Sequence, residues 1–164
     1  MSREIREDRR SRLIDEVGQA AREYGTANDA VDQAAAERLG INRTDIAVLD
    51  ILDQAGGKTT AGALAEASHL TTGAITAVVD RLQKKGYVRR ARDKEDRRRV
   101  LVELTEKVRK KTMELYGPIA EAGYRNLEEY TDEQLEFIRD VMRRATNLLI
   151  EQAGRIRGWR ERPS

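Results

Sequence analysis

The chain contains no cysteine among its 164 residues, which excludes disulfide bonds, thiolate metal sites and thiol-based redox sensing. Its one histidine, His69, has no cysteine or carboxylate cluster beside it and makes a poor metal site. Aromatic residues make up only 4%, so leucine, isoleucine, valine and alanine must fill the core. Such a thin core predicts that a second copy of the chain covers some apolar faces.

No stretch of the chain approaches about 18 consecutive apolar residues, so the sequence predicts no membrane-spanning segment. The N-terminal residues Met1–Arg10 are charged throughout and lack the apolar core of a signal peptide. We therefore expect a cytoplasmic protein without a membrane partner.

Signs of enzymatic chemistry are also missing. Gly57-Lys58-Thr59 resembles the end of a phosphate-binding loop, but such a loop has a second glycine five residues earlier, where this chain has Leu52. No nucleophile stands beside a base in a recognisable pattern. We therefore expect a protein that is not an enzyme and that uses no cofactor and no metal ion.

Positive charge is concentrated in one part of the chain. Residues 84–99 include nine Lys or Arg and three Asp or Glu, a local net charge of +6. The whole chain carries +2, so the remainder carries −4. A basic patch on a slightly acidic body indicates that one site binds a polyanion, and the alternative is a solvated charged hairpin.

Hydrophobic periodicity predicts a mainly helical chain. Apolar residues at steps of three and four predict a long helix over about residues 13–39, which needs a partner for its small-residue stripe. Three shorter helices are expected next. The first is capped by Asn42 and ends at Ala55-Gly56-Gly57, and the second is capped by Thr59 or Thr60 and runs through Ala67. The third is capped by Thr71 and runs to about Lys85.

Two β-type runs follow, at residues 87–91 and 99–104, and the turn between them is too charged to be core. Thr105 is expected to cap a helix that continues to about Tyr130 and that Gly117 and Pro118 kink or split. Thr131, with Gln134 three residues later, predicts a capping box at the start of a last amphipathic helix.

The order helix, turn, helix, strand, basic loop, strand is typical of a domain that places one helix in a DNA major groove. The expected recognition helix begins with hydroxyl and small side chains, which can contact base edges, phosphates and thymine methyl groups. The candidate DNA contacts on and before this helix are Thr59, Thr60, Thr71, Thr72, Gly73 and Thr76.

The hairpin tip supplies a second set of candidate DNA contacts, Lys94, Arg97 and Arg98. Arginine is attracted to the negative potential of a narrow minor groove. Asp96 is close enough in sequence to pair with an arginine across the turn and to orient the tip, although such an exposed pair adds only about 0–1 kcal/mol of stability.

The runs from Leu70 to Arg90 and from Asp93 to Lys107 resemble the MarR family of bacterial winged-helix regulators. The wing signature of that family combines an aspartate, then Asp-Arg-Arg, then a strand that ends in Leu-Thr, and all three parts are present. The order of the flanking helices matches as well, so the resemblance covers nearly the whole chain.

The resemblance implies a homodimer joined through its terminal helices, with two winged-helix lobes on a pseudo-palindromic operator of double-stranded DNA. It also implies that a small-molecule effector commonly alters DNA affinity. Within this sequence, the major-groove positions correspond to Thr71, Thr72 and Thr76, the wing positions to Arg97 and Arg98, and the aspartate that steadies the wing to Asp96.

The chain departs from the family pattern at three positions. Thr72 and Ala77 stand where many relatives carry arginine or another long polar residue, so direct base readout is expected to be thin. Val108 stands where glycine is frequent, which predicts only a local change where the next helix begins.

The predicted fold is therefore mainly α with a small β-hairpin. We expect a dimerisation helix at residues 1–41, a winged helix-turn-helix lobe at 42–104, and dimerisation helices with a basic tail at 105–164. Tyr24 and Tyr116 are candidates for lining an effector pocket, and the alternative is that both lie in the core or the dimer interface.

The predicted function is sequence-specific binding of DNA by a transcription regulator, more specifically a ligand-responsive repressor. Two alternatives from other classes stay open. A protein-interaction module on a winged-helix scaffold would not need the basic tip, and a non-specific architectural protein would bind random DNA with similar affinity.

Overall fold

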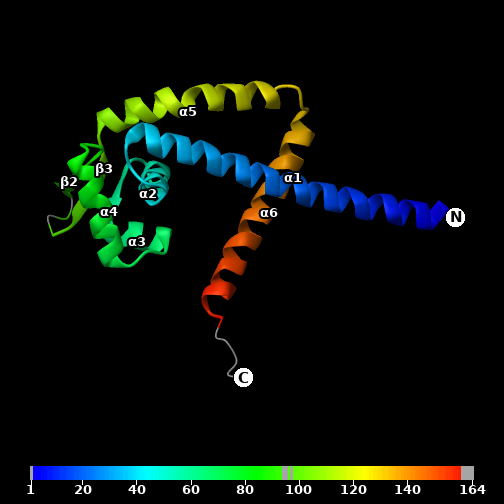
Figure 1. Cartoon of the computed structure of the whole chain (residues 1–164), viewed down its shortest axis with the longest axis horizontal. Coiled ribbons are helices and arrows are strands. Elements are labelled where there is room, and N and C mark those ends of the chain that lie inside the picture. Colours follow the sequence, from blue (N-terminus) through cyan, green and yellow to red (C-terminus); the bar gives the residue numbers. More distant parts are fainter. Residues whose placement is uncertain (1, 94–95, 97, 160–164) are drawn as a thin grey trace. The chain divides into compact units, whose positions relative to one another are not determined.

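The computed structural model describes residues 2–93, 96 and 98–159 (Figure 1). Its elements are α1 (Ser2–Leu39), α2 (Arg43–Gln54), β1 (Lys58–Thr60), α3 (Ala61–Ser68), α4 (Thr72–Lys84), β2 (Val88–Arg92), β3 (Val100–Leu104), α5 (Glu106–Leu127) and α6 (Asp132–Arg157). This order confirms the predicted mainly helical fold with a small sheet. In the described part of the chain, no helix has the length and apolar character needed to cross a bilayer.

The chain forms two compact units, residues 1–115 and 116–164. In the first unit, α2, α3, α4 and the sheet gather at the C-terminal end of α1 (Figure 1). The division into a lobe at 42–104 and dimerisation regions on either side concerns the assembled protein and stays a prediction.

Helix starts follow the predicted caps. The Asn42 side chain accepts a hydrogen bond from the Asp45 backbone at 2.9 Å, and the Asp45 carboxylate accepts one from the Asn42 backbone at 3.2 Å. Thr71 caps α4, and Thr131 forms the expected capping box with Gln134 at α6. Thr60, rather than Thr59, caps α3 through a bond from the Ala63 backbone at 3.2 Å.

Two helices differ from their predicted bounds or shape. α1 begins at Ser2 rather than near Leu13, because its charged N-terminal stretch is rich in the good helix formers arginine and glutamate. Asp8 also pairs with Arg12 one turn later, at 3.2 Å. α5 continues through Pro118 to Leu127, so of the two predicted alternatives, a kink or a split, the split does not occur. Proline removes one internal hydrogen bond there, and the helix on both sides tolerates that loss.

The sheet has a third strand that the sequence did not reveal. β3 lies between β1 and β2 and pairs antiparallel with both, with Thr59 opposite Val102 and Arg89 opposite Glu103. β1 has only three residues, too few for an alternating pattern to be recognised. It closes the outer edge of the hairpin and fixes the segment that leads into α3.

The core of the first unit is aliphatic and lies between α4, α2 and the sheet. α4 buries Ile75, Val78, Val79 and Leu82, at spacings of three and four residues, against neighbouring elements. The other buried apolar residues are Ala35, Ala36, Leu39, Ile46, Val48, Leu49, Leu52, Leu64, Tyr87, Val88, Val102 and Val108. Val108, which stands where glycine was expected to be frequent, is one of these buried residues.

Tyr87 and Thr105 connect the wing, formed by β2, β3 and the turn between them, to the helices around it. The buried Tyr87 hydroxyl donates a hydrogen bond to the Leu39 carbonyl at 2.9 Å, at the end of α1. The Thr105 hydroxyl donates to the Gly86 carbonyl at 2.7 Å, where α4 gives way to β2. The base of the wing is therefore fixed to the ends of two helices.

Two adjacent glycines at the end of α2 allow a matched stability test. Gly56 and Gly57 have φ of 76° and 84°, which favours glycine. A Cβ added at Gly56 meets nothing within 4 Å, whereas one added at Gly57 collides with the Arg109 guanidinium. We expect Gly56→Ala to lower the free energy of unfolding by about 1–2 kcal/mol, the cost of the left-handed backbone, and Gly57→Ala to lower it further.

Urea denaturation of the two variants measures the difference. A third variant, Gly57→Ala with Arg109→Ala, removes the colliding side chain and should recover part of the loss. Equal destabilisation by Gly56→Ala and Gly57→Ala would show that the contact with Arg109 has no energetic consequence.

Candidate nucleic-acid interface

Helix α4 has one buried face and one exposed face, and the exposed face carries the predicted groove contacts. Thr71, Thr72, Gly73 and Thr76 are all exposed at its N-terminal end. Thr71 Oγ1 accepts a hydrogen bond from the Ala74 backbone at 3.2 Å, and Thr76 Oγ1 donates one to the Thr72 carbonyl at 2.9 Å. Thr72 and Thr76 are one turn apart and share a face, so the structure brings these predicted residues together.

Asp45 and Arg81 attach α4 to α2. The Asp45 carboxylate is 1% exposed and receives Arg81 Nη2 on Oδ1 at 2.6 Å and Arg81 Nε on Oδ2 at 3.3 Å. The hydrogen bond to Asp45 raises the pKa of Arg81 above its ordinary value, so this arginine stays charged. Because both guanidinium contacts reach one carboxylate, the pair fixes direction as well as distance.

Arg90 connects the wing to the same helix. From β2 its Nη1 donates to Gln83 Oε1 at 2.6 Å and its Nη2 donates to Asp80 Oδ1 at 2.7 Å. Arg89, the preceding residue, instead pairs with Glu103 across the sheet, with 2.8 Å between Nη2 and Oε2. Arg90 therefore neutralises an acidic side chain on α4 and sets the position of the wing relative to that helix.

Hydrogen bonds shape the turn of the wing. Asp96 Oδ1 accepts a bond from the Arg98 backbone at 3.0 Å, and the Asp96 carbonyl accepts one from the Arg99 backbone at 2.9 Å. Asp96 thus contacts the arginine run through the backbone amides of Arg98 and Arg99. The expected pairing of its carboxylate with an arginine side chain stays a prediction. Arg98 is exposed, and Lys94 and Arg97 lie outside the described residues.

The remaining predicted residues are spread over the chain. Thr59 and Thr60 are half-buried in β1, where Thr60 serves as the α3 cap. Tyr24 is 65% exposed on α1, and Tyr116 is half-buried on α5. The role of these four residues in binding DNA or an effector stays a prediction.

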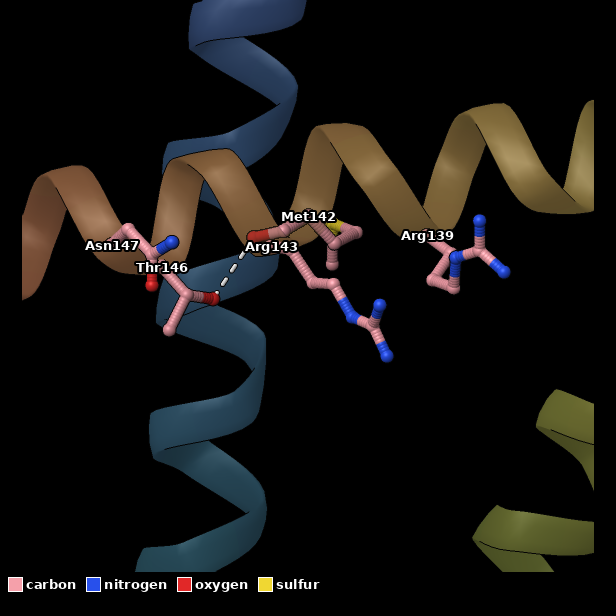
Figure 2. A pocket seen from close by; sticks show the side chains of 5 residues that line it. All are labelled: Arg139, Met142, Arg143, Thr146 and Asn147. Atoms are coloured by element: carbon pink, nitrogen blue, oxygen red, sulfur yellow. Dashed lines mark hydrogen bonds between the residues drawn. The ribbon is translucent and has the colours of Figure 1, made fainter.

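A groove of about 500 Å³ runs along α6 (Figure 2). Its lining residues are Arg139, Met142, Arg143, Thr146 and Asn147. The Thr146 hydroxyl donates to the Met142 carbonyl at 2.9 Å, so its proton is not available to donate to a ligand. One helix cannot enclose a small molecule, whereas ligand sites usually bury most of the ligand surface, so this groove alone makes no effector pocket.

Comparison with known proteins decides the family. The model of the MarR family matches residues 41–100, from the end of α1 to the start of β3. An uncharacterized HTH-type transcriptional regulator of Bacillus subtilis, YcgE, is 39% identical over 148 residues, which cover 90% of this chain and 96% of that protein. The chain belongs to the MarR family.

Solved structures of a MarR family protein and of another transcriptional regulator have the same fold. A MarR family protein from Bacillus stearothermophilus is 21% identical and superimposes with a TM-score of 0.64, covering 85% of this chain and 97% of that one. The transcriptional regulator BldR from Sulfolobus solfataricus is 27% identical, with a TM-score of 0.52 and coverage of 80% and 94%.

Members of the MarR family regulate transcription and bind operator DNA as homodimers. The protein is accordingly a DNA-binding transcription regulator of the MarR type, with double-stranded DNA and a second copy of itself as partners. The order α3, α4, β2, β3 is the predicted order of a helix-turn-helix followed by a two-stranded wing.

Arg90 and Arg89 provide a test of how the wing is positioned. Arg90→Gln removes the cation that neutralises Asp80, so we expect operator affinity to fall by about 1–2 kcal/mol more than in Arg89→Gln, which removes the same charge from the neighbouring residue. Fluorescence anisotropy with a labelled operator duplex at fixed salt measures both affinities.

The double variant Asp80→Asn with Arg90→Gln serves as the control, because it removes the carboxylate together with its partner. It should recover much of the affinity that Arg90→Gln loses. If Arg89→Gln and Arg90→Gln weaken binding equally, the contact between Arg90 and α4 does not contribute to DNA binding.

Proposed function

We propose that the protein is a cytoplasmic repressor that binds a pseudo-palindromic operator, with α4 of each protomer in one of two successive major grooves. The observation that carries this proposal is the division of α4 into a buried apolar face and an exposed N-terminal face of small and hydroxyl side chains. Recognition helices contact base edges through their N-terminal residues, and half-sites of a symmetric dimer lie about one helical turn apart.

The wing reaches the minor groove beside each half-site. The Asp96 contact with the Arg98 backbone supports a fixed turn, and the local charge of +6 over residues 84–99 favours phosphate and a narrow groove. Lys94, Arg97 and Arg98 supply the contacts, and Thr59 and Thr60 lie on the segment leading into α3. In this arrangement residues 42–104 form the DNA-binding lobe, and residues 1–41 and 105–164 form the dimer.

Genomic selection tests the function. Purified protein is incubated with sheared genomic DNA, bound fragments are sequenced, and the strongest site is then measured by gel shift beside the region upstream of the protein's own gene. We expect a pseudo-palindromic site that binds about 10³-fold or more tightly than random DNA. We also expect Arg97→Ala and Arg98→Ala to weaken binding, with each lowering the log–log salt slope by about 1, and to leave the fold intact.

Circular dichroism of the two arginine variants controls for unfolding. Similar affinity for random and selected DNA would indicate an architectural protein, and no binding at low salt would indicate a protein-interaction module. Wild-type affinity in both arginine variants at physiological salt would contradict the role of the wing.

An effector acts, in this proposal, by favouring a spacing of the two lobes that mismatches successive grooves. Tyr24 and Tyr116 are the candidate pocket residues, because each joins an apolar ring to a hydroxyl. We expect Tyr24→Phe and Tyr116→Phe to reduce release of operator DNA by an inducer found in a small-molecule screen, with unchanged affinity in its absence. A full response in the double variant would remove both tyrosines as candidates.

A further inference from the structure

Most long polar side chains of α4 are engaged inside the lobe. Arg81 donates twice to Asp45, and both Asp80 and Gln83 accept from Arg90 at 2.7 and 2.6 Å. These contacts hold the helix in place. The side chains that make them are therefore occupied when the helix approaches DNA.

The remaining long donors on α4, the Gln83 amide nitrogen and Lys84, lie far from its N-terminal end. Lys84 is the last residue of the helix, twelve residues after Thr72, and a rise of about 1.5 Å per residue separates them by about 18 Å along the axis. The first six residues are Thr-Gly-Ala-Ile-Thr-Ala, and Ile75 is buried. The N-terminal end of α4 therefore presents no arginine, lysine, asparagine or glutamine to a base.

Thr76 has already used its only hydroxyl proton. Its Oγ1 donates to the Thr72 carbonyl at 2.9 Å, so towards DNA the oxygen is an acceptor and the exposed side chain also offers a methyl group. Thr71 Oγ1 accepts the Ala74 backbone as the helix cap. Ala77, one residue after Thr76, is exposed and offers only a methyl group.

We propose that this regulator recognises its half-site mainly through the 5-methyl groups of thymine, which Thr72, Thr76 and Ala77 contact with their own methyl groups. The inference rests on the proposed placement of α4 in the major groove. The thymine methyl projects into that groove and distinguishes T·A from the other pairs, whereas bidentate recognition of guanine requires an arginine or lysine. Half-sites rich in thymine at the positions beneath α4 follow from this chemistry.

The small side chains also permit the close approach that methyl contacts need. Dispersion and apolar burial act over only a few ångströms, so a helix that carried long side chains on this face would stand too far from the groove floor. Nothing lies within 4 Å of the position of a Cβ at Gly73, so this face is open at its first turn. Burial of one methyl group corresponds to about a fourfold change in affinity.

Uracil substitution tests the proposal directly. Uracil keeps the hydrogen-bonding groups of thymine and lacks only the methyl group. Duplexes of the strongest selected site are synthesised with uracil at the thymines beneath α4. In the matched control, uracil replaces only thymines beneath the wing, which is proposed to lie in the minor groove, where the thymine methyl group does not project. We expect uracil at each thymine whose methyl group α4 contacts to weaken binding about fourfold, and we expect the control duplex to bind like the parent duplex. 7-Deazaguanine in place of guanine should have no effect beneath α4.

Two variants of Thr76 separate its methyl from its hydroxyl. Thr76→Val keeps a methyl and should bind the parent duplex within about twofold of wild type. Thr76→Ser keeps the hydroxyl and should lose about fourfold, with no further loss on the uracil duplex at the contacted position. Thermal denaturation of both variants confirms that the lobe is folded.

The outcomes distinguish this inference from the proposed function. Tight binding of a selected site that uracil does not weaken, or loss of binding in Thr76→Val but not in Thr76→Ser, overturns methyl recognition while leaving the regulator intact. Failure to select any site overturns the proposed function, and the inference with it.

Discussion

The ion pair between Asp45 and Arg81 is the constraint on which the placement of α4 depends. Asp45 caps α2 through the Asn42 backbone and, with the same carboxylate, receives two bonds from Arg81. Its burial makes those partners necessary, since breaking a fully buried pair costs about 3–5 kcal/mol. The cost is lower here because Arg81 is half-exposed. Cap geometry on one helix thereby fixes the direction of the next.

The structural contacts of α4 are also divided unevenly along its length. Its apolar stripe packs on the core, and its C-terminal half is joined by arginines to α2 on one side and to the wing on the other. Stability is therefore concentrated where DNA contacts are not expected. On the exposed face of the N-terminal half, the side chains make no hydrogen bonds with α2 or with the described residues of the wing, and small residues are tolerated there for that reason.

Local signals in the sequence predicted much of this fold, whereas contacts between residues far apart in the sequence could not be predicted from it. Asn42, Thr71 and Thr131 cap helices as predicted, because each cap involves residues three positions apart. β1 was not predicted, because three residues are too few to show an alternating pattern and the strand is defined only by its pairing with β3. Asp45 looked like a first-turn acid, and only the fold brings Arg81, 36 residues later, against it. At the candidate site the sequence identified the exposed threonines but not Arg90, whose partners depend on the angle between strand and helix.

The apolar faces of α1 and α6 connect assembly to DNA binding. α6 has no buried residue among its 26, and it exposes Leu148, Leu149, Ile150 and Ile156. A helix that buries so little gains little from its own chain, which agrees with the prediction that a second copy covers it in the homodimer. Two lobes on one duplex bind far more tightly than one, because the second contact is intramolecular. If α1 and α6 form the dimer as proposed, residues that never touch DNA set operator affinity through the monomer–dimer equilibrium, and α4 needs only weak contacts of its own.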